Sequence, residues 1–221
     1  MTRPWLRLNA ATLTSLLLLA PSSGAFDTPL SDTAVREAYF LGQHHDEVFA
    51  DLLRKYAIAL PEPKSGPYIA SVSFYTPYAL TALNSNQHPL SYSAQQAQLD
   101  HLKQPEIVRV VVQICFTASY GQFIVHPVGF RSNSPKGFEV RPYDFWRQFR
   151  VRVFQNDRFI VPRNAYGEPS LRCGDDGCDV TGATLTFEYP ADAFTENSAT
   201  VETDPPEGDP VVVDFDLTSF R

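Results

Sequence analysis

The sequence predicts an α+β fold that is mainly an antiparallel β-sandwich of about eight or nine strands, with N-terminal helices packed on one sheet or at one end. Segments with helical periodicity lie mostly in residues 31–104, whereas residues 105–221 alternate like successive strands. Frequent Gly, Pro, Asn and Asp turns separate these strands, as is typical of antiparallel sandwiches. We therefore expect a single domain over residues 26–221, helix-rich in its first part and β-rich in its second.

The strongest strand signal lies in residues 105–120, the most apolar stretch after the N-terminal segment. With a period of two, one face is apolar and the other is mixed, so we expect a long strand with one face in the core. The expected core face carries Val108, Val110, Val112, Ile114, Phe116 and Ala118.

Residues 1–25 have the features of a cleaved signal peptide. Arg3 and Arg7 precede a short apolar run, and Ser23-Gly24-Ala25 places small residues before an expected cut at Ala25–Phe26. Removing 25 of the 221 residues leaves 196, and losing the two arginines takes the net charge from −7 to −9. This charge argues against nucleic acid as a partner. We expect a periplasmic or secreted protein without a transmembrane segment in its mature chain.

Four helices are expected before the long strand. The first is capped by Ser31 or Asp32, and the second carries apolar residues from Val48 to Ala57. Thr76 followed by Pro77 predicts the start of a short helix that ends at Leu83. The fourth helix runs from about residue 94 to 102, after a Ser cap, and Pro105 ends it.

The remaining strands are bounded by turn signals. Asn156-Asp157 predicts the two-residue turn of a hairpin. The expected strands are 68–75, 122–130, 149–153, 158–161, 183–189, 199–203 and 211–217, together with those that flank the Cys173–Cys178 turn.

Two of the three cysteines predict a disulfide. Cys173 and Cys178 enclose Gly-Asp-Asp-Gly, a turn that brings strand ends within bonding reach in an oxidising compartment. Closing so short a loop stabilises the fold by about 2 kcal/mol on the loop-entropy model. Cys115 is left over, and its place in the central strand predicts a buried, free thiol.

Charge is unevenly distributed along the strands. Residues 131–163 hold eight basic and three acidic residues, whereas residues 173–216 hold twelve acidic residues and no basic one. The simpler interpretation places basic and acidic strands side by side, where they neutralise each other. Two separate surface patches are the alternative.

An aromatic segment supplies the candidate ligand-binding residues: Tyr143, Asp144, Trp146 and Arg147. Aromatic rings beside Arg and Asp can cover the apolar face of a sugar and bond its hydroxyls. The same residue types also anchor protein interfaces. A third interpretation is that Trp146 packs in the core together with Phe149.

Metal and cofactor signals are weak, and we predict no cofactor and no metal site. Asp175, Asp176 and Asp179 could supply calcium ligands with Asp204, Glu207 and Asp209, although solvated turn acids are the simpler interpretation. On a helix, His44 and Glu47 could share an ion, whereas His44 and His45 diverge. The sequence holds no nucleophile-elbow, phosphate-loop or dinucleotide motif.

These observations favour an exported, non-enzymatic β-sandwich protein that acts as a binding or structural module in the cell envelope or periplasm. Its expected partner is an unknown protein or glycan of the envelope. The first alternative is a carbohydrate-binding surface around Tyr143 and Trp146. The second is an exported hydrolase that acts on envelope glycans or peptides, for which a cleft of converging acids would be required.

Overall fold

A computed structural model describes most of the chain after the predicted signal peptide. The described residues are 25–88, 90–118, 120, 123–125, 138–140, 142, 144–174, 177–206 and 208–221. Residues 1–24 and Tyr143 lie outside these residues, so the predictions made for the signal peptide and for Tyr143 stay predictions.

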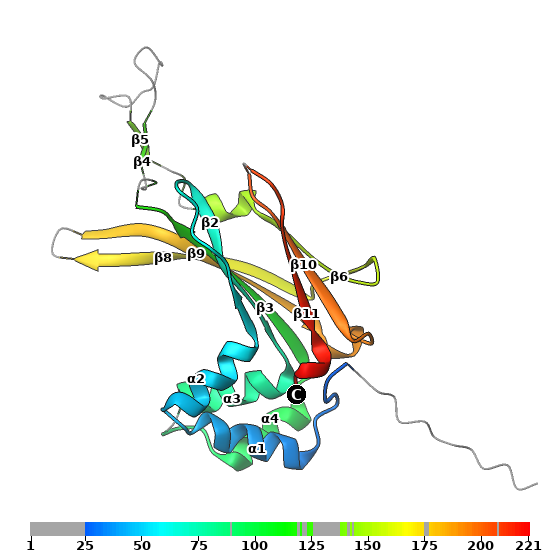
Figure 1. Ribbon diagram of the computed structural model, residues 1–221. Helices are drawn as coiled ribbons and strands as arrows, with labels where there is room; N and C mark the ends of the chain where they lie inside the picture. The colour runs from blue at the N-terminus through cyan, green and yellow to red at the C-terminus, as the bar shows by residue number, and fades with distance from the viewer. Residues whose placement is uncertain are drawn as a thin grey trace, which may run out of the picture.

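Nine antiparallel strands form two sheets packed face to face (Figure 1), which confirms the predicted α+β sandwich. The first sheet has the order β1-β2-β3-β9-β8 and the second has the order β11-β10-β6-β7. The first comprises β1 (Ala57–Ala59), β2 (Pro67–Tyr75), β3 (Ile107–Phe116), β9 (Gly177–Pro190) and β8 (Asn164–Gly174). The second comprises β11 (Val211–Asp216), β10 (Ser198–Asp204), β6 (Arg150–Gln155) and β7 (Arg158–Ile160). A separate pair is formed by β4 (Phe123–Val125) and β5 (Phe138–Val140).

Strand β3 supplies the centre of the sandwich core, as its alternation predicts. Val108, Val110, Val112 and Ile114 are all 0% exposed. Burying a side chain of this size is worth about 1.5–3 kcal/mol relative to leaving it in water. Residues of the second sheet, including Val153, Val201 and Phe215, belong to the same core cluster.

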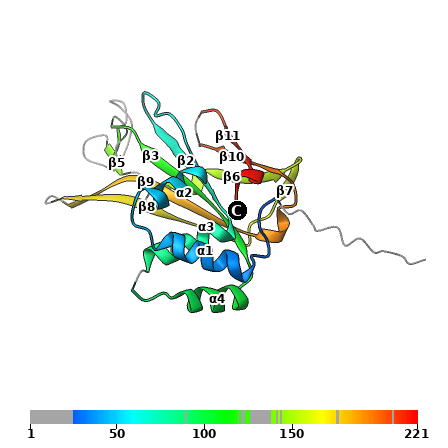
Figure 2. The same ribbon diagram turned by 60° about the horizontal axis from the view of Figure 1, so that its bottom comes forward.

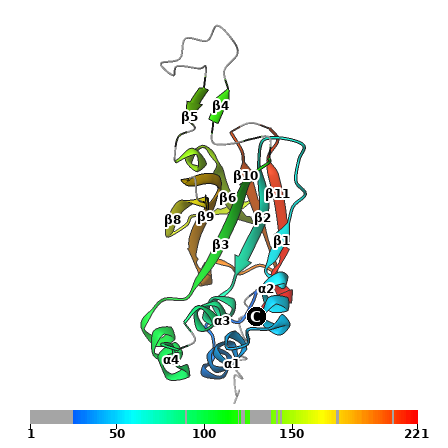
Figure 3. The same cartoon turned by 90° about the vertical axis from the view of Figure 1, so that its left-hand side faces the viewer.

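Four helices gather at one end of the sandwich (Figures 2 and 3) and share a second apolar core. They are α1 (Asp32–Gly42), α2 (Glu47–Lys55), α3 (Pro77–Gln87) and α4 (Ala94–Lys103). Their N-caps are Ser31, Asp46, Thr76 and Ser93, each of which accepts a hydrogen bond from a first-turn N–H. Such caps satisfy donors that the helix itself leaves unpaired.

Two helix predictions need correction. The second helix ends at Lys55, and Ala57 begins β1 instead, because residues 57–59 pair with β2. The third helix continues past Leu83 to Gln87. Its last turns bond to α1, since the Ser85 hydroxyl donates to the Tyr39 carbonyl at 2.8 Å and the Asn86 amide donates to the Gly42 carbonyl at 3.0 Å.

The predicted hairpins are both present. Asn156 and Asp157 have φ angles of 44° and 63°, so the turn between β6 and β7 has two left-handed residues. Cys173 and Cys178 form the predicted disulfide near the tip of the β8–β9 hairpin. Strand β3 pairs with β9 only as far as Gly182, so residues 171–174 and 177–180 form a two-stranded arm beyond the sheet (Figure 1).

Basic and acidic residues form ion pairs between neighbouring strands of the same sheet, as the simpler interpretation of the charge pattern predicts. Arg152 on β6 contacts Glu202 at 3.0 Å and Asp204 at 2.7 Å on β10. Arg109 on β3 contacts Glu188 on β9 at 2.9 Å. These strands carry their opposite charges side by side.

The side chain of Gln155, at the end of β6, forms hydrogen bonds to the backbone of the segment that leads into β10. It is only 2% exposed. Its amide donates to the carbonyls of Glu196 at 3.0 Å and Ser198 at 2.9 Å, and its oxygen accepts from the Thr195 N–H at 3.0 Å.

Candidate functional site

The predicted aromatic segment lies at the end of the sandwich opposite the helices. Residues Phe145–Gln148 form a short 3₁₀ helix, η1, the yellow-green turn at the upper end of the sandwich in Figure 1. The side chains of Asp144 and Arg147 are exposed and form an ion pair with a 3.2 Å separation between Oδ2 and Nε. Such an exposed pair contributes little to stability, so both groups are free to meet a ligand.

Trp146 and Phe145 are the buried residues of η1, and only 9% of Trp146 is exposed. Its ring lies over Gly167 of β8: a Cβ built at Gly167 would stand 2.5 Å from Trp146 Cδ1 and 2.8 Å from Leu185 Cδ2. Both atoms are closer than van der Waals contact permits. The missing side chain at Gly167 is therefore what makes room for the indole.

A groove of about 410 Å³ opens beside this ring. We name it the Trp146 groove. By strand register, Ala165, Gly167, Leu185 and Phe187 share the face of the sheet that carries the core. The groove is thus a solvent-open extension of the sandwich core along β8, the edge strand of its sheet among the described strands. It is lined by Trp146, Arg147, Phe149, Ala165, Tyr166, Gly167, Leu185 and Phe187.

The chemistry of the Trp146 groove suits binding. Its lining is mostly aromatic or aliphatic, and Arg147 supplies a cation at the rim. Apolar walls with a few polar groups that fix orientation are typical of ligand pockets, and the volume falls in their usual range. An apolar group that enters would displace water from the indole and from Phe149 and Phe187.

The predicted candidates include Trp146 and Arg147, which line the groove, and Asp144, which does not, whereas the strand side of the groove was not predicted. The structure brings Trp146 to Gly167, Leu185 and Phe187, which are 21 to 41 positions later in the chain. One signal was available: a glycine inside a strand often marks a close approach by another group. Tyr143 lies outside the described residues.

The other predicted candidates do not assemble a site. His44 contacts Asp46 at 3.6 Å, whereas Glu47 pairs with Arg54, so His44 and Glu47 do not converge. Asp204 pairs with Arg152. Asp175, Asp176 and Glu207 lie outside the described residues. In the part of the chain that is described, no three His, Cys, Asp or Glu side chains group as a metal site requires.

Cys115 is free, as predicted, but it is half-buried rather than fully buried. It lies on the face of β3 that points away from the core, where it pairs with Gly182. The sequence prediction was therefore wrong about its burial, because the core takes the opposite face of this strand.

Comparison with known proteins adds no relative: no protein-family model matches the chain, and a search of curated proteins finds no significant match. Within the described residues, no helix has both the length and the apolar character needed to cross a membrane.

Proposed function

We propose that this chain is an exported, non-enzymatic binding module of the periplasm, cell envelope or exterior. Its Trp146 groove receives an apolar side chain of a protein partner. The observation that carries the proposal is the groove itself, an apolar hollow of about 410 Å³ at an open sheet edge. Grooves of this kind commonly hold the anchoring side chain of a bound protein.

The burial of Trp146 favours an apolar side chain over a sugar as the occupant. A sugar stacks on an open ring face, whereas only 9% of Trp146 is exposed. Phe149, Leu185 and Phe187 add apolar walls with few groups that could bond hydroxyls. Arg147 at the rim can donate to a backbone carbonyl of the partner.

Two features support export. The N-terminal residues have the pattern of a signal peptide. The disulfide lies on exposed Cys173 and Cys178, where a reducing compartment would have access to it. Both fit a protein that works outside the cytoplasm.

The experiment fills the groove and measures binding of an apolar probe. The anionic dye 1-anilinonaphthalene-8-sulfonate combines aromatic rings with a group that complements Arg147. We expect saturable binding by the parent protein and at least ten-fold weaker binding by Ala165→Phe, whose ring would occupy the groove. Ala50→Phe on α2 makes the same substitution at an exposed helix position and should bind the dye as the parent does. Unchanged binding by Ala165→Phe would refute the groove as the site.

A further inference from the structure

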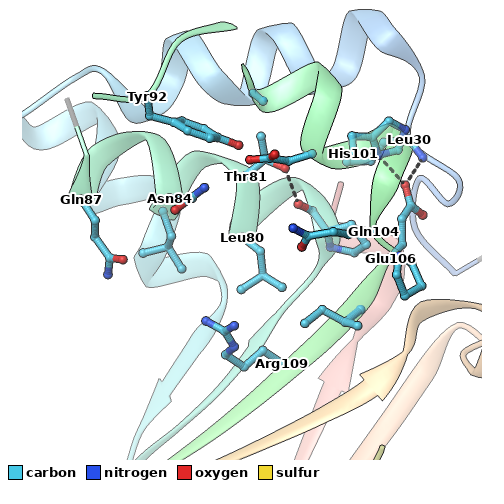
Figure 4. A pocket seen from close by; sticks show the side chains of 16 residues that line it. Leu30, Leu80, Thr81, Asn84, Gln87, Tyr92, His101, Gln104, Glu106 and Arg109 are labelled. Carbon is cyan, nitrogen blue, oxygen red and sulfur yellow. Dashed lines mark hydrogen bonds and ion pairs between the residues drawn. The ribbon is translucent and has the colours of Figure 1, made fainter. Parts of the chain in front are cut away.

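A second hollow, of about 420 Å³, lies between α3 and α4 (Figure 4). We name it the interhelical cavity. Both helices pack on α1 but hardly touch each other, which leaves a gap between them. Ile107 and Arg109 at the start of β3 close the gap from the sandwich side. The cavity is thus at the opposite end of the sandwich from the Trp146 groove.

Polar side chains of both helices line this cavity. Thr81, Asn84 and Gln87 of α3 stand at i, i+3 and i+6, so they share one helix face. Gln104, which follows α4, contributes an amide from the other side, and Tyr92 contributes a hydroxyl. Figure 4 shows Asn84, Tyr92 and Gln104 arranged around the same space.

Several of these groups have hydrogen-bonding capacity to spare. The Thr81 hydroxyl donates to the Pro77 carbonyl of its own helix at 2.9 Å and retains its acceptor capacity. The side-chain amides of Gln87 and Gln104 make no hydrogen bond to another described residue. Each amide can donate and accept, which matches the double role of a hydroxyl group.

Two of the charged side chains that line the cavity, Glu106 and Arg109, already have partners within the protein. Glu106 accepts from the Thr28 hydroxyl and the Leu30 N–H, both at 2.6 Å, and it contacts His101 at 3.4 Å. Arg109 is paired with Glu188. These two side chains therefore need no charged partner from a ligand.

An anion would meet net negative charge in the cavity. Asp100 and Glu106 line it, and Glu188 lies against Arg109, the one Arg or Lys side chain among the described lining residues. Burial raises the pKa of Tyr92, and the neighbouring Asp100 raises it further, so the phenol stays a neutral donor. Coulomb repulsion by the carboxylates disfavours phosphates and carboxylates as ligands.

We propose that the interhelical cavity binds a neutral sugar of one or two rings. The amides of Gln87 and Gln104 and the carboxylate of Asp100 would bond its hydroxyls, while Leu80 and Ile107 would cover its C–H surface. The volume is within the range of small-molecule pockets. The site is separate from the Trp146 groove, and this inference does not depend on the function proposed for that groove.

The test is calorimetric titration of the protein comprising residues 26–221 with neutral sugars, added one at a time. The probes are glucose, galactose, N-acetylglucosamine and their β-1,4-linked disaccharides. We expect at least one saturable isotherm, weakened about ten-fold by Gln104→Ala, since one lost hydrogen bond in a binding site is worth about that factor. Gln95→Ala makes the same substitution at an exposed position of α4 outside the cavity and should leave the isotherm unchanged.

Three outcomes would overturn the proposal. One is the absence of binding by every sugar in the set. Another is equal weakening by Gln104→Ala and Gln95→Ala. The third is sugar binding that shifts the emission of Trp146 and ignores Gln104→Ala, because it would place the sugar in the Trp146 groove. A sugar that binds in the cavity leaves Trp146 emission unchanged, whatever the groove itself binds.

Discussion

Replacing Gly167 by alanine tests how the Trp146 groove is built. The new Cβ would stand 2.5 Å from Trp146 Cδ1, where carbon atoms need about 3.5 Å, so the indole must move outward by about 1 Å. Overpacking of this kind costs about 1–3 kcal/mol. Alanine recovers about 0.5–1 kcal/mol of that cost, because glycine is unfavourable inside a strand. We expect a net loss of about 1 kcal/mol and a Tm lower by about 2–4 °C.

The assay is urea unfolding followed by circular dichroism, together with the emission spectrum of Trp146. Gly167→Ala should lower the free energy of unfolding and shift the emission to longer wavelength, because the displaced ring meets more water. Gly174→Ala is the matched control on the same strand, since nothing lies within 4 Å of a Cβ at Gly174. Equal stability of both variants, with unshifted emission in Gly167→Ala, would refute the inferred contact between Trp146 and Gly167.

Three further changes test other parts of the fold. Gln155→Leu leaves buried carbonyl and N–H groups unpaired and should lower the free energy of unfolding in urea by about 3 kcal/mol. The matched change at an exposed position, Gln148→Leu, should alter it by no more than about 0.5 kcal/mol. Equal losses in the two variants would contradict this role of Gln155. Burial raises the pKa of Tyr189, whose hydroxyl is buried without a partner in the described part of the chain. The ionised form is therefore favoured in the unfolded chain, so stability is retained below about pH 10 and falls as pH rises above it. Tyr189→Phe should flatten that fall, and a parallel alkaline decline in both proteins would be inconsistent with this role. Reduction of Cys173–Cys178 should raise amide hydrogen exchange in residues 171–174 and 177–180 and leave β3 protected, because the two-stranded arm is marginal by itself. Unchanged exchange in the arm would show that the disulfide does not order it.

Local signals predicted much of the fold. The alternation of Val108 to Ile114 gave the central strand and its buried face. Thr76 with Pro77 gave a helix start, and Asn156-Asp157 gave a hairpin turn, because each depends on the conformations of a few adjacent residues. Cys173 and Cys178 gave the disulfide for the same reason.

Tertiary contacts decided what the sequence prediction missed. Residues 57–59 form a strand only because β2 lies beside them. Ser85 and Asn86 are weak helix formers, but their side chains bond to α1 and extend α3 to Gln87.

Both hollows depend on which elements become neighbours. The Trp146 groove needs η1 to meet Gly167 on β8, and the order of the strands is not evident from their periodicity. The interhelical cavity arises because α3 and α4 each pack on α1 and not on each other. No local pattern in the sequence predicts either arrangement, and ligand binding by Trp146, Asp144 and Arg147 stays a prediction.

The emission of Trp146 during titration with small analogues of protein side chains tests most directly whether the Trp146 groove binds apolar side chains. Trp146 is the one Trp in residues 26–221, and it lines the Trp146 groove, so its signal reports on that site. The function proposed for the Trp146 groove predicts a saturable shift with N-acetyl-leucinamide and N-acetyl-phenylalaninamide, and none with N-acetyl-alaninamide or the neutral sugars. Emission that shifts only with sugars, or with none of these compounds, would contradict it.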